Sequence, residues 1–86
     1  KKKDNAQFKL YPNPIRKGQV LNWTRKGYES QVMDIQIHNL QGEIVLKYKQ
    51  VKEILIPNYL SQGMYILKAK ADYQDEWLTK EKLIIY

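Results

Sequence analysis

The sequence predicts an all-β fold, an antiparallel immunoglobulin-like β-sandwich of about seven short strands. Two observations lead to this prediction. Apolar residues recur at every second position in several short segments, and no long segment shows the spacing of an amphipathic helix. Glycine, proline and asparagine separate these segments at short intervals, as turns between strands require. A small open barrel is the alternative architecture.

The composition limits what the chain can be. Its 86 residues suffice for one small domain with one core, and 43% of them are hydrophobic. The absence of cysteine excludes disulfides, thiolate catalysis and cysteine-based zinc sites. No apolar run is long enough to span a bilayer, so no integral membrane segment is expected. We expect residues 1–7 to be a linker or tail and residues 8–86 to form the domain.

The most rigid point of the first strand region is the corner Pro12-Asn13-Pro14, which follows an expected strand at residues 7–11. Two prolines one residue apart remove two backbone donors and push the residue before each of them away from helix. The corner therefore ends the first strand. A second interpretation, that it also belongs to a surface read by a partner, stays open.

The second strand is expected at residues 19–23, with Val20 inward and Leu21 and Trp23 as further inward candidates. A turn around Gly27 should follow it.

The centre of the sequence has the clearest pattern, a β-hairpin. Two alternating segments flank the turn residues NLQG, in which Gly42 can take a positive φ. The expected inward residues are Met33, Ile35 and Ile37 on the first strand and Ile44, Leu46 and Tyr48 on the second.

Three further strands complete the expected sandwich. KEILIP forms a short one that Pro57 ends or places at an edge, with either Leu55 or the pair Ile54 and Ile56 inward. Gly63 begins the next, whose inward residues are Tyr65, Leu67, Ala69 and Ala71. The turn DYQDE leads to the last strand. Its inward face is ambiguous between two sets of alternating residues, which are Trp77, Leu83 and Ile85, or Leu78, Ile84 and Tyr86.

The sequence offers little chemistry. His38, the only histidine, lies near a strand end, and neither Ser30 nor Ser61 belongs to a nucleophile motif. The acidic group Asp72, Asp75 and Glu76 lacks the spacing of a calcium loop and reads as a hairpin turn. We therefore expect no enzyme, no catalytic residue, no metal and no cofactor.

The net charge of +6 raises nucleic acid or an anionic surface as a partner. The lysines, however, occur in dispersed pairs at alternate positions, as on a solvated strand face that resists edge pairing. The aromatic residues best placed for base stacking are Tyr48, Tyr65 and Trp77, and of these Tyr48 and Tyr65 are expected in the core. No nucleic-acid partner is therefore expected.

Four segments carry a resemblance to a known family. They are LYPNP at 10–14, IQIHNLQGEIV at 35–45, LSQGMYIL at 60–67 and KLII at 82–85. In this order they resemble the C-terminal sorting domain of type IX secretion cargo proteins, the Por secretion tail family of Bacteroidetes-type bacteria. The resemblance covers residues 8–86. It departs from the family's pattern at His38, where tyrosine is common, at Asn39, where aspartate is usual, and at Pro57.

The resemblance implies a set of sorting-motif residues: Pro12, Asn13, Pro14, Gly42, Leu60, Gly63, Tyr65, Lys82, Leu83 and Ile84. It also implies a function, that of a non-catalytic signal that directs an attached cargo protein across the outer membrane. The implied partners are the outer-membrane type IX translocon, its shuttle protein and a surface sortase, with cleavage upstream of the domain and attachment of the cargo at the cell surface. The domain would pass through the periplasm and then be secreted or surface-bound.

Two other function classes stay open from the sequence. A cell-surface carbohydrate-binding or adhesion sandwich would need exposed aromatic residues in a row. A single-strand nucleic-acid binder would need a salt-sensitive affinity.

Overall fold

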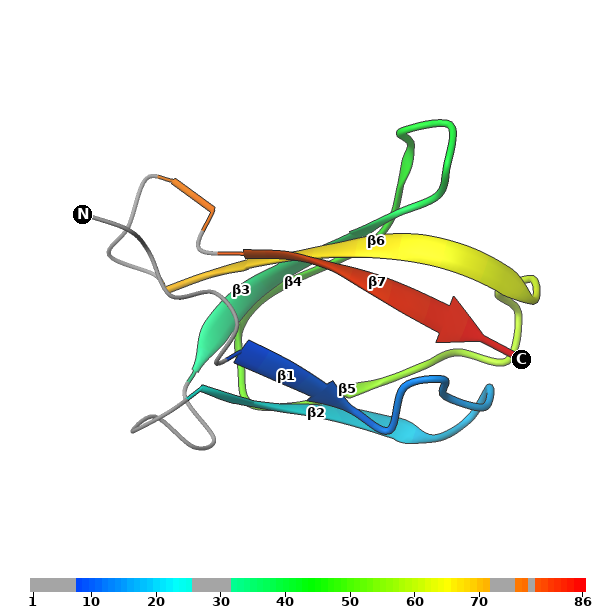
Figure 1. Cartoon of the computed structure of the whole chain (residues 1–86), viewed down its shortest axis with the longest axis horizontal. Coiled ribbons are helices and arrows are strands. Elements are labelled where there is room, and N and C mark those ends of the chain that lie inside the picture. The colour runs from blue at the N-terminus through cyan, green and yellow to red at the C-terminus, as the bar shows by residue number, and fades with distance from the viewer. Residues whose placement is uncertain (1–7, 26–31, 72–75, 78) are drawn as a thin grey trace.

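The structure, a computed structural model, describes residues 8–25, 32–71, 76–77 and 79–86 (Figure 1). The turn expected around Gly27, most of the turn DYQDE, Leu78 and the expected linker 1–7 lie outside this range. Within it, no helix could cross a membrane. The seven strands are β1 (Phe8–Tyr11), β2 (Val20–Arg25), β3 (Met33–His38), β4 (Ile44–Val51), β5 (Ile54–Leu55), β6 (Gly63–Lys70) and β7 (Thr79–Ile85).

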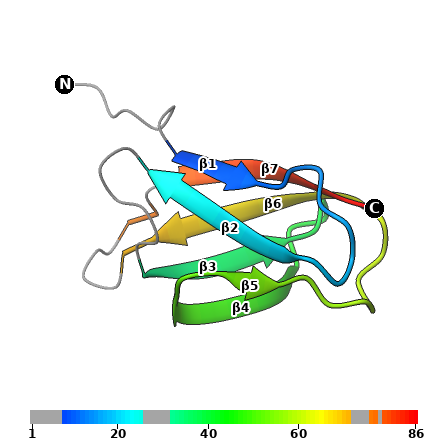
Figure 2. The ribbon, with the colours of Figure 1, turned by 90° about the horizontal axis from the view of Figure 1, so that it is seen from below.

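The strands form two antiparallel sheets that pack face to face (Figures 1 and 2). The three-stranded sheet has the order β1-β2-β5, and the four-stranded sheet has the order β4-β3-β6-β7. Each sheet turns one face to the other, so alternate residues of a strand enter the shared core. This arrangement confirms the predicted all-β, immunoglobulin-like sandwich.

The two central strands of the four-stranded sheet supply much of the core. The predicted inward residues of β3 are fully buried, and those of β6 are at most 6% exposed. Burying one large aliphatic side chain contributes about 1.5–3 kcal/mol, so these strands hold much of the stability. The confirmed residues are Met33, Ile35 and Ile37 on β3, and Tyr65, Leu67 and Ala69 on β6, with Ala71 just after it.

Val20 was predicted inward, and this is wrong. It is 39% exposed and pairs with Leu55, which is 56% exposed. Side chains of directly paired residues share a face of the sheet. The next pair, Leu21 with Ile54, is therefore the buried one, and Trp23 is buried on the same side as Leu21. On β5 the inward residues are accordingly Ile54 and Ile56 rather than Leu55.

Ile44 was also predicted inward but is 49% exposed. It pairs with His38, whereas Leu46, two residues on, pairs with Ile37. A register shift lies between Ile37 and His38, and such a bulge turns the following residues to the other face. Leu46 is buried as predicted, and Tyr48 is half-buried at the margin of the core.

The facing of β7, which the sequence left open, is fixed by its pairing with β6. Leu83 pairs with buried Tyr65, and both Leu83 and Ile85 are buried. Ile84 and Tyr86 remain 38% and 49% exposed. Trp77, which precedes β7, does not join Leu83 and Ile85 in the core. It lies half-buried beside lysines of β6.

Candidate recognition surface

The proline corner carries the chain from one sheet to the other. β1 pairs with β2, but after the corner Ile15 forms a parallel bridge with Ile85 at the edge of β7. The backbone N–H of Ile15 donates to the Ile84 carbonyl at 2.8 Å, and the Ile15 carbonyl accepts from the Tyr86 N–H at 2.9 Å. The Lys17 N–H adds a bond to the Tyr86 carbonyl at 3.0 Å.

Asn13 extends this pairing with its side chain. Its Nδ2 donates to the Lys82 carbonyl at 2.8 Å, and its Oδ1 accepts from the Ile84 N–H at 3.1 Å. One amide group thus satisfies a donor and an acceptor of β7, as a neighbouring strand would. The prolines on either side, both preceded by cis peptide bonds, have no N–H to offer. We call residues 13–17 the latch, because they cover the edge of β7 from Lys82 onward.

A second motif lies on the other side of β7. Gly63 pairs with Ile85 and has a φ of +150°, a conformation that disfavours side chains with a Cβ. The Tyr65 hydroxyl donates to the Ser61 carbonyl at 2.7 Å, which fixes the loop before the strand. Leu60 is buried beneath this loop at 7% exposure.

The β3–β4 turn is built around Asn39. Its Oδ1 accepts from the N–H groups of Gln41 at 3.0 Å and Glu43 at 2.9 Å, and its Nδ2 donates to Glu43 Oε1 at 2.8 Å. The Gly42 N–H donates to the Asn39 carbonyl, and Gly42 has a φ of +90°. The Asn39 carboxamide both accepts from the turn backbone and donates to Glu43, so asparagine suits this position.

These segments gather at the end of the sandwich where the C-terminus lies (Figures 1 and 2). The latch contacts β7 directly, and residues of the β3–β4 turn and of the loop before β6 line one depression of about 330 Å³. The structure therefore brings all four motif segments to one end. Three of the candidate residues are buried and serve the fold: Leu60, Tyr65 and Leu83. The others are exposed there: Pro12, Asn13, Pro14, Gly42, Gly63, Lys82 and Ile84.

Replacing Asn13 by alanine should lower the free energy of unfolding by about 1–2 kcal/mol. It removes two exposed hydrogen bonds to β7, each worth about 0.5–1.5 kcal/mol in net terms. Urea denaturation measures the effect. The control is Asn22→Ala on β2, whose side chain makes one local bond of 3.4 Å and should change stability by less than about 0.5 kcal/mol. Equal midpoints for the two variants would show that the latch does not depend on the Asn13 amide.

His38 is held as a structural residue. Its Nε2 lies 3.1 Å from Gln36 Oε1, and its Nδ1 lies 3.3 Å from the Gly42 carbonyl oxygen. One ring nitrogen thus faces a backbone oxygen of the β3–β4 turn, and the other faces a side-chain oxygen on β3 itself. Among the described residues there is no cluster of three acidic or histidine side chains that could hold a metal ion. Asp72 and Asp75 lie outside these residues.

The lysine pairs that look dispersed in the sequence meet on one surface. Direct pairing places Lys47, Gln36, Lys68 and Lys80 in one row across the four-stranded sheet, on the face turned away from the core. We call this surface the lysine face. Sequence reasoning missed it because it depends on the order of the strands. Its lysines are Lys47 and Lys49 on β4, Lys68 and Lys70 on β6, and Lys80 and Lys82 on β7.

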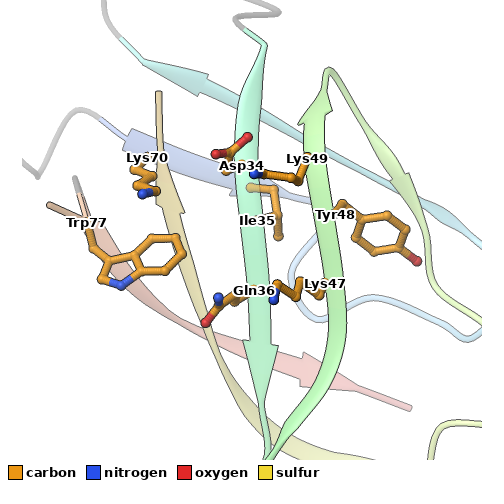
Figure 3. A pocket seen from close by; sticks show the side chains of 8 residues that line it. All are labelled: Asp34, Ile35, Gln36, Lys47, Tyr48, Lys49, Lys70 and Trp77. Carbon is orange, nitrogen blue, oxygen red and sulfur yellow. The ribbon is translucent and has the colours of Figure 1, made fainter. Parts of the chain in front are cut away.

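Trp77 lies against this face (Figure 3). The Nζ atoms of Lys70 and Lys68 lie 5.3 and 5.9 Å from its ring centroid, within the range of cation–π contacts. The hollow beside it has a volume of about 140 Å³. Asp34 is buried there at 6% exposure, and its Oδ1 accepts from the Gln50 N–H at 2.9 Å. Burial raises the pKa of Tyr48 at the far margin of the hollow, and the nearby Tyr59 raises it further.

The exposed tyrosines of the described region lie at the ends of three different strands or beyond them. Tyr11 ends β1, Tyr59 lies in the loop after β5 and Tyr86 follows β7. Arg16 of the latch stacks over Tyr86 at 5.6 Å.

Comparison with known families gives a match over nearly the whole chain. The model described as the secretion system C-terminal sorting domain matches residues 9–86. Comparison with curated proteins gives no match. The matched range includes every strand except the first residue of β1 and contains all four motif segments.

Proposed function

The chain belongs to the family of secretion system C-terminal sorting domains, and from this premise we propose that it carries an attached cargo protein across the outer membrane by type IX secretion. The family match over residues 9–86 carries the proposal. The gathering of the motif segments at one end supports it, because a partner could read them together there.

The finer steps follow from the same proposal. The cargo and its domain pass through the periplasm, where a shuttle protein and the outer-membrane translocon recognise the folded domain. A surface sortase then cuts upstream of residue 8 and attaches the cargo to the cell surface. The domain contributes no catalytic group to these steps. Rigid turns such as the Asn39 turn and the latch present a fixed surface, so binding loses little conformational entropy.

An export assay tests the proposal. Residues 8–86 are fused behind a signal peptide and a passive globular reporter in a bacterium with a type IX system. We expect the reporter outside the cell or on its surface, whereas a strain without the translocon should retain it in the periplasm.

The matched control replaces the domain with an unrelated immunoglobulin-like sandwich of similar size. This control should remain periplasmic in both strains. The proposal fails if the fusion stays in the periplasm of the competent strain, or if it leaves the periplasm equally well without the translocon.

A further inference from the structure

A groove runs along one end of the lysine face. Its floor is the outward face of β6 and β7, and its wall is the β3–β4 turn. Figure 1 shows this turn rising from the four-stranded sheet on the side away from β1, β2 and β5. The groove encloses about 600 Å³, which is within the range of ligand-binding clefts.

The groove is positively charged. Lys68 and Lys80 pair directly across β6 and β7, and Lys82 follows on the same face. Like charges placed opposite one another destabilise a sheet, so an anion bound between them would relieve a repulsion that folding creates. Against these three lysines, the described part of the lining contains one carboxylate, that of Glu81, which accepts a hydrogen bond from the Thr79 hydroxyl at 2.6 Å. The lining therefore keeps an excess of positive charge.

The groove also has apolar surface. Leu40 on the wall is 61% exposed, and Ile66 on the floor is half-buried. Lys47, Lys49 and Lys70 continue the positive charge beyond the groove along the same face. Charged and apolar side chains thus lie close together in the lining of the groove.

We propose that this groove binds an extended acidic polypeptide segment of a partner protein, with apolar residues between its carboxylates. The carboxylates would meet Lys68, Lys80 and Lys82, and the apolar side chains would meet Leu40 and Ile66. Because binding is measured on the isolated 86-residue chain, its outcome is independent of whether export occurs.

Two other polyanions fit the groove less well. The β3–β4 turn rises from the sheet beside the lysines of the floor, so a flat anionic bilayer would meet the turn first. Single-stranded nucleic acid is usually held by bases stacked on several aromatic rings, whereas the described groove lining contains none and Trp77 lies in the neighbouring hollow, under Lys68 and Lys70. The cations are lysines rather than the arginines that grip phosphate in a bidentate way.

Fluorescence anisotropy tests the proposal with a labelled peptide of alternating glutamate and leucine. We expect saturable binding of one peptide per chain that weakens as NaCl rises from about 50 to about 300 mM. Peptides in which lysine or serine replaces glutamate should not bind. The triple variant Lys68→Gln, Lys80→Gln, Lys82→Gln should bind about tenfold more weakly, the loss expected for three partly exposed ion pairs.

The matched control is the triple variant Lys9→Gln, Lys17→Gln, Lys52→Gln. It has the same net charge as the first variant, and none of its positions lines the groove. Leu40→Ser adds a second probe that leaves the charge unchanged and should also weaken binding. Circular dichroism confirms that each variant is folded. Equal losses for the two triple variants would overturn the proposal, because general charge would then explain binding. Stronger binding to anionic vesicles or to single-stranded DNA than to the acidic peptide would overturn it as well.

Discussion

Deleting Lys82–Tyr86 is expected to leave the domain largely unfolded at room temperature. The deletion removes Leu83 and Ile85, which are 0% and 1% exposed, and each contributes about 1.5–3 kcal/mol by burial. It also removes every partner of the latch on β7, and it exposes the edge of β6 between Gly63 and Ile66. A domain of this length has a total stability of only about 4–13 kcal/mol.

Near-ultraviolet circular dichroism and urea denaturation measure this loss. The control is a triple variant that keeps the backbone and the buried residues Leu83 and Ile85 and should stay folded. It carries the substitutions Lys82→Ser, Ile84→Ser and Tyr86→Ser. In the export assay, the fusion with the deletion should accumulate in the periplasm or be degraded there. A cooperative transition at the midpoint of the full chain would contradict the role given to these five residues.

Leu83→Ala should lower the free energy of unfolding by about 2–5 kcal/mol, the usual range for a buried leucine. The neighbouring Ile84→Ala should cost less than about 1 kcal/mol, because that side chain is 38% exposed and only its backbone bonds to Asn13. Urea midpoints of the two variants give the comparison. If Ile84→Ala proves as damaging as Leu83→Ala, the facing of β7 described above is wrong.

The success of sequence reasoning depended on how the apolar residues alternate. On β3, Met33, Ile35 and Ile37 alternate with polar residues, so only one facing could bury them. On β7, apolar residues occupy both odd and even positions, and the pairing of Leu83 with Tyr65 decides which of them enter the core. Ile44 was assigned wrongly because a bulge within the hairpin reverses the facing, and periodicity does not reveal a bulge.

The candidate surface was predicted as a set of segments but not as an assembly. Pro12-Asn13-Pro14 looked like a corner, and its role as cover for β7 depends on contacts between residues that are 69 and 71 positions apart. The lysine face likewise appears only once β4, β3, β6 and β7 are placed side by side. Local patterns carry no information on such neighbours, since strand order is set by the packing of the whole sandwich.

The latch also imposes an order of events during synthesis. Asn13 and Ile15 leave the ribosome early, but their partners at Lys82, Ile84 and Tyr86 are among the last residues of this domain to be made. Closing so long a loop yields no contact until the final strand is available. A nascent chain interrupted before residue 82 therefore contains β1 to β6 but lacks the residues of β7 and beyond that the latch contacts. The proline corner and its surroundings can take their final shape only on molecules whose synthesis has passed residue 86.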